Sequence, residues 1–169
     1  DSLDTNDEWI KKRTGIRQRH LVTEGELTST MAIAAAKKAL QNANIDNKDI
    51  DLIIVATTTP DKTFPATAVM VQSELNIGVC PAFDIQAVCA GFIYALNVGS
   101  SLLKTSNFSK ALVIGSESFS KILDWSDRST SVLFGDGAGA FVLEKCNEHY
   151  EWGILSSNFY SNGKFSNIL

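Results

Sequence analysis

The sequence predicts an α/β fold built on a mainly parallel sheet. Continuous apolar runs at residues 52–56 and 111–115 have the pattern of strands buried on both faces, and a further strand is expected at residues 82–85. Segments with helical spacing lie between these strands, and such alternation predicts a layered fold with right-handed crossovers. Ligands of such sheets bind beyond the carboxyl ends of the strands, so the residues after each run are the first candidates for a site.

The first part of the chain combines a polar opening with a helix. Residues 1–26 carry a basic cluster made of Lys11, Lys12, Arg13, Arg17, Arg19 and His20. A charge run of this kind fits a solvated face, although Trp9 beside it can hold a planar anionic ligand. A helix is predicted over residues 28–44, with Thr28 or Ser29 as its cap and an alanine-rich buried stripe.

The elements that follow continue the alternation. A second helix is predicted over residues 66–75, with Val69 and Met70 facing the core, and an amphipathic helix follows the strand at 82–85. After a polar loop at 116–129, a hairpin is expected from strands 131–134 and 138–144. A last strand at 152–158 and a hairpin turn at Asn162-Gly163 complete the prediction.

Composition narrows the class of protein. The 169 residues fit one domain or a large part of one, and the net charge of -4 gives no basic excess for nucleic acid or for an anionic membrane. Cys80, Cys89 and Cys146 have irregular spacing, and His20 and His149 are the two histidines, so disulfide and zinc sites are weak hypotheses. No metal is expected. The absence of a membrane-spanning apolar run or a signal peptide favours a reducing, cytoplasmic location.

Cys89 is the most informative residue of the chain. It lies where the strand at 82–85 has ended and a helix begins. The first amides of a helix lack partners within it and the helix dipole is positive there, which favours the reactive thiolate. The alternative is a small buried hydrophobe, as most free cysteines are. Spacing alone leaves both interpretations open.

A glycine-rich segment, FGDGAGA at residues 134–140, has a superficial likeness to a phosphate-binding loop. It lacks the Gly-Lys-Ser/Thr ending and lies between two predicted strands. We therefore interpret its glycines as serving a tight turn and close backbone packing, and expect Asp136 to cap backbone amides rather than to bind a metal. Neither His20 nor His149 is an obvious base for Cys89.

Four segments carry a family likeness. They read DEWI and RTGIR within residues 7–17, VATTTP and FP within 55–65, QAVCAGF at 86–92, and DR followed by FGDGAGA within 127–140. In this order they resemble β-ketoacyl-acyl-carrier-protein synthase III, the condensing enzyme that initiates bacterial fatty acid synthesis. The likeness runs from about residue 5 to residue 158 and is weaker over 160–169.

The resemblance implies the thiolase-like fold, in which two similar α/β halves pack as five layers, αβαβα. The chain, residues 1–169, would cover most of the first half without its first strand and without the second half. Cys89 would take an acyl group from acetyl-CoA or another short acyl-CoA, and the carbanion formed by decarboxylation of malonyl-acyl carrier protein would then attack it. Because the family's catalytic His and Asn lie in the second half, this chain alone is expected not to complete the condensation. It is also expected to be poorly stable, because it exposes the face that packs on the second half.

The family's binding residues carry over to matching positions. Trp9 and Arg128 would sandwich the CoA adenine, and Arg13 would meet the nucleotide phosphates. The Cys89 amide would contribute to an oxyanion hole. The CoA thioester is a substrate, and no cofactor is expected.

The acyl pocket is expected to be aromatic. Phe64 would reach the partner subunit's pocket across a homodimer, while Phe119 and Phe134 would line the pocket and limit chain length. The resemblance leaves alternatives: another CoA-dependent starter acyltransferase, such as a quinolone or polyketide starter enzyme or a hydroxymethylglutaryl-CoA synthase, and a non-catalytic module that binds acyl-CoA or carrier protein. A redox-sensing protein that uses Cys89 is the remaining class.

Overall fold

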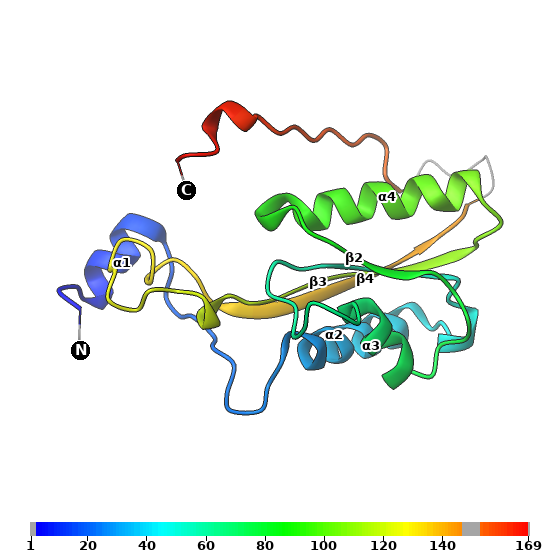
Figure 1. Cartoon of the computed structure of the whole chain (residues 1–169), viewed down its shortest axis with the longest axis horizontal. Coiled ribbons are helices and arrows are strands. Elements are labelled where there is room, and N and C mark those ends of the chain that lie inside the picture. Colours follow the sequence, from blue (N-terminus) through cyan, green and yellow to red (C-terminus); the bar gives the residue numbers. More distant parts are fainter. Residues whose placement is uncertain (1–2, 147–152, 169) are drawn as a thin grey trace.

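The computed structural model describes residues 3–146 and 153–168, and its centre is a four-stranded sheet of order β2-β1-β3-β4 (Figure 1). The strands are β1 (Leu52–Ala56), β2 (Ala82–Ile85), β3 (Lys110–Ser118) and β4 (Asp136–Glu144). β1 pairs in parallel with both β2 and β3, whereas β4 returns antiparallel to β3. The predicted α/β class and mainly parallel sheet are confirmed.

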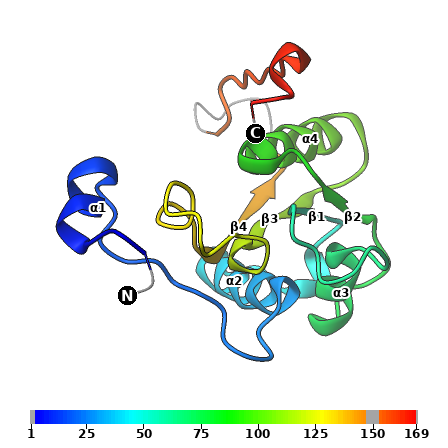
Figure 2. The same ribbon diagram turned by 60° about the vertical axis from the view of Figure 1, so that its left-hand side comes forward.

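Helices cover both faces of this sheet. α2 (Thr28–Ala43) and α3 (Thr67–Glu74) lie on one face and α4 (Gly91–Thr105) lies on the other, while α1 (Asp7–Thr14) stands apart from the sheet (Figures 1 and 2). Short 3-10 helices are η1 (Asn47–Asp49), η2 (Val88–Ala90), η3 (Phe119–Lys121) and η4 (Gly163–Phe165). None of the helices in the described ranges is long and apolar enough to cross a membrane.

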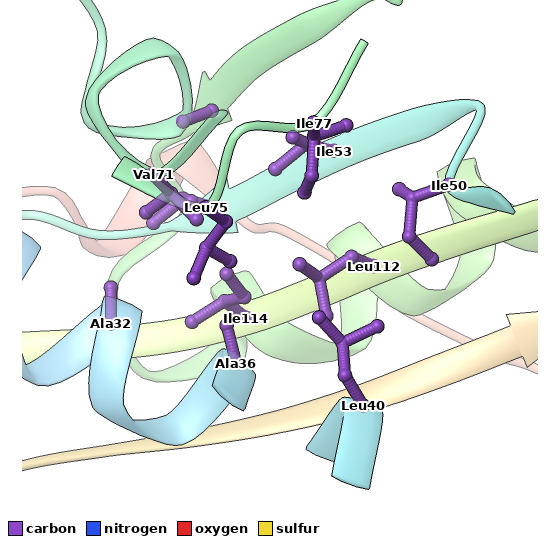
Figure 3. Packing of buried hydrophobic residues seen from close by; sticks show 12 residues of the cluster. Ala32, Ala36, Leu40, Ile50, Ile53, Val71, Leu75, Ile77, Leu112 and Ile114 are labelled. Carbon is purple, nitrogen blue, oxygen red and sulfur yellow. The ribbon is translucent and has the colours of Figure 1, made fainter. Parts of the chain in front are cut away.

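The core has two parts because side chains alternate along β1 and β3. Toward α2 and α3 point Ile53, Val55, Leu112 and Ile114, which pack with Leu40, Val71 and Leu75 (Figure 3). Toward α4 point Leu52, Ile54, Ala111 and Val113. Both sets are buried, which is why these strands are continuously apolar in sequence.

Small residues bring the helices close to the sheet. Ala32 and Ala36 of α2 have no exposed surface. On α4, a Cβ added at Gly91 would lie 3.4 Å from Ala56 Cβ, and one at Gly99 would lie 3.2 Å from Val113 Cγ2. α4 therefore lies on the sheet at a distance that a larger side chain would increase.

The helix starts differ from the prediction in detail. Neither Thr28 nor Ser29 caps α2; the Thr28 hydroxyl donates instead to the Thr59 carbonyl at 2.6 Å. Thr30 Oγ1 accepts from the Leu27 amide at 2.9 Å and closes the helix start. Thr28 is the first residue of α2 and is buried, and its side chain bonds to the loop after β1 instead of to the helix.

α3 presents a different face from the one predicted. Thr67, Ala68 and Val71 are buried, whereas Val69 is 38% exposed. The Asp84 carboxylate of β2 accepts from the amides of Thr67 at 2.7 Å and Ala68 at 2.8 Å. This cap fixes the rotation of a helix too short to be oriented by apolar spacing alone.

The predicted strand at 131–134 is wrong, because these residues form turns. The Asp127 carboxylate accepts from the amide and hydroxyl of Ser129, at 2.8 and 2.6 Å, and its carbonyl accepts from the Ser131 amide at 3.0 Å. Ser131 and Val132 are buried within these turns, whereas Leu133 is 43% exposed, so the apolar run does not mark a buried strand.

The end of the chain also departs from the prediction. Of the strand predicted at 152–158, residue 152 lies outside the described residues and 153–158 are not in a strand. Asn162 does not open a hairpin; its side chain accepts from the Lys164 amide at 3.1 Å and caps η4. The predicted hairpin between residues 131–134 and 138–144 is also wrong, because the antiparallel partner of β4 is β3; only its second strand is confirmed, within β4.

Candidate functional site

Cys89 lies on a strained corner between β2 and α4. Val88 before it has φ 48°, in the left-handed region that a β-branched residue rarely adopts, and the chain passes through η2 into the first turn of α4. Cys89 is exposed, as are Val88 and Ala90. The alternative of a buried structural cysteine is therefore wrong, because the corner presents the thiol to solvent.

The other cysteines have different environments. Cys80 is half-buried, and burial raises the pKa of its thiol above the ordinary value, opposed by a hydrogen bond from Gln72. Cys146 is exposed, and its thiol lies 3.6 Å from the Glu144 carbonyl. All three cysteines are free. Exposure alone thus does not single out Cys89; its place at the sheet's carboxyl edge does.

A cavity of about 300 Å³ opens beside Cys89. Its wall is built by the carboxyl ends of β1 and β3, the start of β4 and the first turn of α4: Ala56, Val88, Cys89, Phe92, Gly115, Ser116, Glu117, Gly137, Ala138 and Gly139. This is the edge of the sheet where ligands of parallel α/β folds bind. The cavity supports Cys89 as a nucleophile with room for a small group.

The glycines at and near this wall have separate roles. A Cβ on Gly135, which lies outside the cavity lining, would be 3.0 Å from the His20 carbonyl, so this glycine permits close packing as predicted. The predicted tight turn is wrong, because Asp136 and Gly137 belong to β4. A Cβ on Gly115 would lie 3.2 Å from Phe92 Cδ2, whereas one on Gly137 or Gly139 would have nothing within 4 Å, so the space beside the latter two glycines is open to the cavity.

Glu117 forms a polar part of the wall that sequence reasoning missed. Its carboxylate accepts from the amides of Thr58 at 2.7 Å and Thr59 at 3.1 Å, and from the Thr59 hydroxyl at 2.5 Å. These bonds hold the loop after β1 against the end of β3. The sequence offered little signal, because Glu117 lies between Ser116 and Ser118, in a stretch predicted as a polar loop.

Asp136 binds backbone amides, as predicted. Its carboxylate accepts from the amides of Val22 and Ser120, each at 2.7 Å, and from the Ser120 hydroxyl at 2.5 Å. Burial acts to raise the pKa of Asp136, but the bonds from Ser120 and Val22 and the charge of Lys121 outweigh it, and the pKa lies below its ordinary value. Asp136 is therefore a carboxylate at neutral pH.

The predicted nucleotide-binding residues come together at α1. The guanidinium carbons of Arg13 and Arg128 each lie 5.4 Å from the centre of the Trp9 ring. Asn6 caps the helix by accepting from the Trp9 amide at 2.8 Å, which orients the indole. Two cations beside one indole form a surface suited to a flat anionic ligand.

Arg128 is also engaged by Asp4 in this structure. Its guanidinium donates to the Asp4 carbonyl and lies 3.3 Å from the Asp4 carboxylate. A base stacked between Trp9 and Arg128 needs roughly 7 Å between them, two contacts of about 3.5 Å. At 5.4 Å the pair is closed, so Arg128 must move outward for a base to enter between them.

The three phenylalanines assigned to the acyl pocket are dispersed. The rings of Phe119 and Phe134 stack with centroids 4.6 Å apart, but neither ring lines the cavity beside Cys89. Phe64 lies in the loop after β1 and is 82% exposed. The stacked pair and the projecting ring are compatible with their proposed roles, which stay predictions.

No histidine base for Cys89 is evident in the described residues; the Glu117 carboxylate shares the cavity wall and is hydrogen-bonded to Thr58 and Thr59. The cavity lining contains no histidine, His20 is exposed, and His149 lies outside the described residues. The described side chains also contain no group of three or more His, Cys, Asp or Glu that could hold a metal ion.

Comparison with known proteins gives consistent matches. Residues 83–163 match the family model of 3-oxoacyl-[acyl-carrier-protein (ACP)] synthase III. A β-ketoacyl-[acyl-carrier-protein] synthase III of Ehrlichia canis (strain Jake) is 56% identical over 168 residues, which are 99% of this chain and 52% of that protein. The chain spans about half the length of the curated relatives it matches.

Solved structures agree with the sequence matches. The 3-oxoacyl-[acyl-carrier-protein] synthase III from Aquifex aeolicus VF5 matches with a TM-score of 0.83 and 51% identity, over 86% of this chain and 47% of that one. The priming β-ketosynthase from the R1128 polyketide biosynthetic pathway matches with a TM-score of 0.83 and 37% identity, over 86% of this chain and 43% of that one. The fold is thus the thiolase-like fold of these proteins, over their first half.

Proposed function

Because the chain shares its sequence and its fold with the β-ketoacyl-[acyl-carrier-protein] synthase III family, we propose that it carries the acyl-transfer half of that family's reaction. The observation that carries the proposal is the exposed Cys89 on a strained corner, at the rim of a cavity at the sheet's carboxyl edge. The substrate is acetyl-CoA or another short acyl-CoA.

The transfer step requires a thiolate and a thioester. Cys89 Sγ attacks the thioester carbonyl carbon, a bond forms between them, and the oxyanion intermediate collapses as the bond to the CoA sulfur breaks. The CoA thiolate takes up the proton that Cys89 released. The helix start at η2 and α4 favours the negative charge on sulfur, and the Cys89 amide contributes to the oxyanion hole.

The nucleotide end of the substrate is assigned to Trp9, Arg13 and Arg128. Their mutual geometry supports this assignment, because an indole and two guanidiniums suit an adenine and its phosphates. The second substrate, malonyl-acyl carrier protein, and a homodimer in which Phe64 enters the partner's acyl pocket complete the proposal. Condensation needs the family's His and Asn, so the chain of 169 residues is expected to accept an acyl group without forming a ketoacyl product.

Mass spectrometry of the intact chain tests the proposal. After incubation with acetyl-CoA, we expect a gain of one acetyl group that disappears in Cys89→Ser. The matched control is Cys146→Ser, which removes another exposed cysteine and should leave the gain unchanged. Acetylation that survives Cys89→Ser, or no acetylation of the wild-type chain, would contradict the proposal. Oxidation of Cys89 without acyl transfer would favour the redox alternative.

The likeness to a priming β-ketosynthase keeps a second candidate open, a starter acyltransferase with another acyl preference. A panel of acyl-CoA thioesters of increasing length and branching separates the two. Fastest acylation by acetyl-CoA favours the fatty-acid enzyme, and fastest acylation by a longer or branched thioester favours the starter acyltransferase.

A further inference from the structure

Asp136 joins two segments that are far apart in sequence. It is the first residue of β4, and its carboxylate accepts from the Val22 amide on one side and from the amide and hydroxyl of Ser120 on the other. Its own amide donates to the His20 carbonyl at 2.7 Å. One side chain thus fastens the segment after α1 to η3.

Each of the two fastened segments leads to one member of the Trp9–Arg128 pair. The segment at residues 20–22 follows α1, which carries Trp9. η3 leads into the loop that carries Arg128, and the Ser120 carbonyl accepts from Trp125 Nε1 of that loop at 3.1 Å. Asp136 is therefore the point in the described structure from which both sides of the nucleotide site are held.

The three hydrogen bonds to the Asp136 side chain all require that its two oxygens act as acceptors. Two backbone amides and one hydroxyl point at the carboxylate, so an asparagine side chain would place an NH₂ group against one of these donors. Substitution by asparagine keeps the volume of the side chain but breaks part of the junction. The consequence falls on the relative position of the two segments rather than on the core, which lies elsewhere on the sheet.

We propose that Asp136 is a positioning residue that sets the spacing of Trp9 and Arg128 and thereby the recognition of the nucleotide end of the acyl-CoA substrate. The inference rests on the proposed function. Asp136 touches neither the cavity beside Cys89 nor the Trp9 ring, so its effect is transmitted through Val22 and Ser120.

The test compares two thioesters that share a reacting group. Acetyl-CoA carries the nucleotide, and S-acetylpantetheine lacks it, so their rates of Cys89 acetylation separate nucleotide recognition from chemistry. For Asp136→Asn we expect the rate with acetyl-CoA to fall about tenfold or more, the effect of losing a hydrogen bond to a charged group. The rate with S-acetylpantetheine should stay at the wild-type value.

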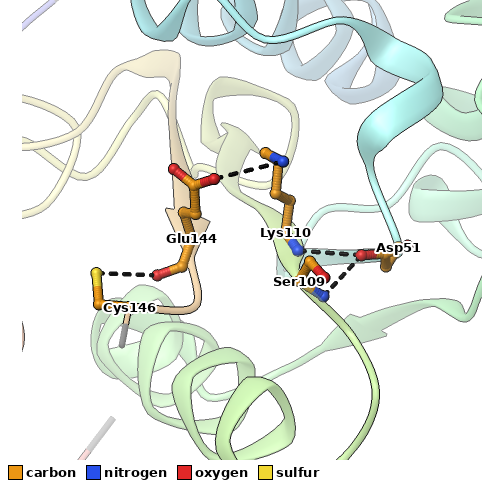
Figure 4. A network of polar contacts seen from close by, with 5 residues as sticks. All are labelled: Asp51, Ser109, Lys110, Glu144 and Cys146. Atoms are coloured by element: carbon orange, nitrogen blue, oxygen red, sulfur yellow. Dashed lines mark hydrogen bonds and ion pairs between the residues drawn. The ribbon is translucent and has the colours of Figure 1, made fainter. Parts of the chain in front are cut away.

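The matched control is Asp51→Asn at the opposite end of the sheet. The Asp51 carboxylate also accepts from two backbone amides, those of Ser109 at 2.7 Å and Lys110 at 3.1 Å (Figure 4). It leads to neither Trp9 nor Arg128, so its rates with both thioesters should match those of the wild type.

Equal losses with both thioesters, or no loss with either, would overturn the inference while leaving the proposed function intact. A wild-type chain that takes acetyl from neither thioester would overturn both. If Asp136→Asn does not fold, judged by circular dichroism, Ser120→Ala removes one bond to the carboxylate and should show the same selective loss at smaller size. The absence of that selectivity in Ser120→Ala would also reject the inference.

Discussion

The two ends of the sheet are built with the same device and differ in what they leave exposed. At the amino end of β1, Asp51 accepts from the amides of Ser109 and Lys110 and closes the entry to β3 (Figure 4). At the carboxyl end, Glu117 and Asp136 also bind backbone amides, but they hold loops around a cavity. At the amino end, a carboxylate ties neighbouring segments together, whereas at the carboxyl end carboxylates hold loops around the cavity.

Backbone strain also differs between the two ends of the sheet. Among the described non-glycine residues, positive φ occurs at Asn44, Asn76 and Val88. Asparagine tolerates this conformation, and the two asparagines end or follow helices, whereas valine does not tolerate it. The unfavourable conformation therefore coincides with the corner that presents Cys89.

The largest effect should come from the core that both ends share. Ile114 is fully buried in β3 and packs between the strands and α2. Ile114→Ala should lower the free energy of unfolding by about 2–5 kcal/mol, from lost burial and a residual cavity. Urea unfolding measures this loss, and an effect under about 1 kcal/mol would show that the core tolerates the deletion.

The carboxyl end should respond to acid through Asp136. Its pKa is lowered in the folded state, so its contribution to stability is complete above the ordinary value of 3.8 and is lost as pH falls through the lowered value. Solvent screening limits the contribution to about 1–2 kcal/mol. Thermal unfolding from pH 5 downward should show a shallower acid decline in Asp136→Asn than in wild type, and parallel declines would argue against the junction.

The strain at Val88 predicts a gain in stability. Val88→Gly should raise the free energy of unfolding by about 1 kcal/mol, because glycine adopts φ 48° without a steric penalty. Val79→Gly is the matched control, since Val79 is fully exposed and not among the positive-φ residues, and it should bring no gain. Destabilisation by both changes alike would mean that the corner is not strained.

The smallest effect belongs to the amino end. Lys110 Nζ lies 3.4 Å from a Glu144 carboxylate oxygen, and the glutamate side chain is 59% exposed (Figure 4). Glu144→Gln should cost at most about 1 kcal/mol, as for other exposed pairs, and less in high salt. A loss of several kcal/mol in chemical unfolding would make this pair a structural element rather than a surface contact.

Sequence reasoning succeeded where the signal was local. The buried strands followed from unbroken apolar runs, the position of Cys89 from a strand end beside a helix start, and the amide binding of Asp136 from its place among glycines. These patterns act over a few neighbouring residues, so they can be read without knowing the fold.

Sequence reasoning failed where a distant side chain decided the outcome. The rotation of α3 depends on Asp84 of β2, and the turns at 131–134 depend on Asp127. The role of Glu117 in the cavity wall could be predicted only if the position of the loop after β1 were already known, because its carboxylate accepts from the Thr58 amide of that loop. Such bonds join segments whose proximity only the folded chain reveals.

The glycines of α4 make the reactive sulfur adjustable from a distance. Cys89 precedes a helix that packs closely on the sheet at Gly91 and, two turns further on, at Gly99, where an added Cβ would lie 3.2 Å from Val113 Cγ2, closer than an ordinary contact. A methyl group added at Gly99 would tilt the helix as a lever and shift the thiol relative to the cavity. Variation at a position far from the cavity can therefore change where the thiol lies relative to it, a route open to evolution and to engineering alike.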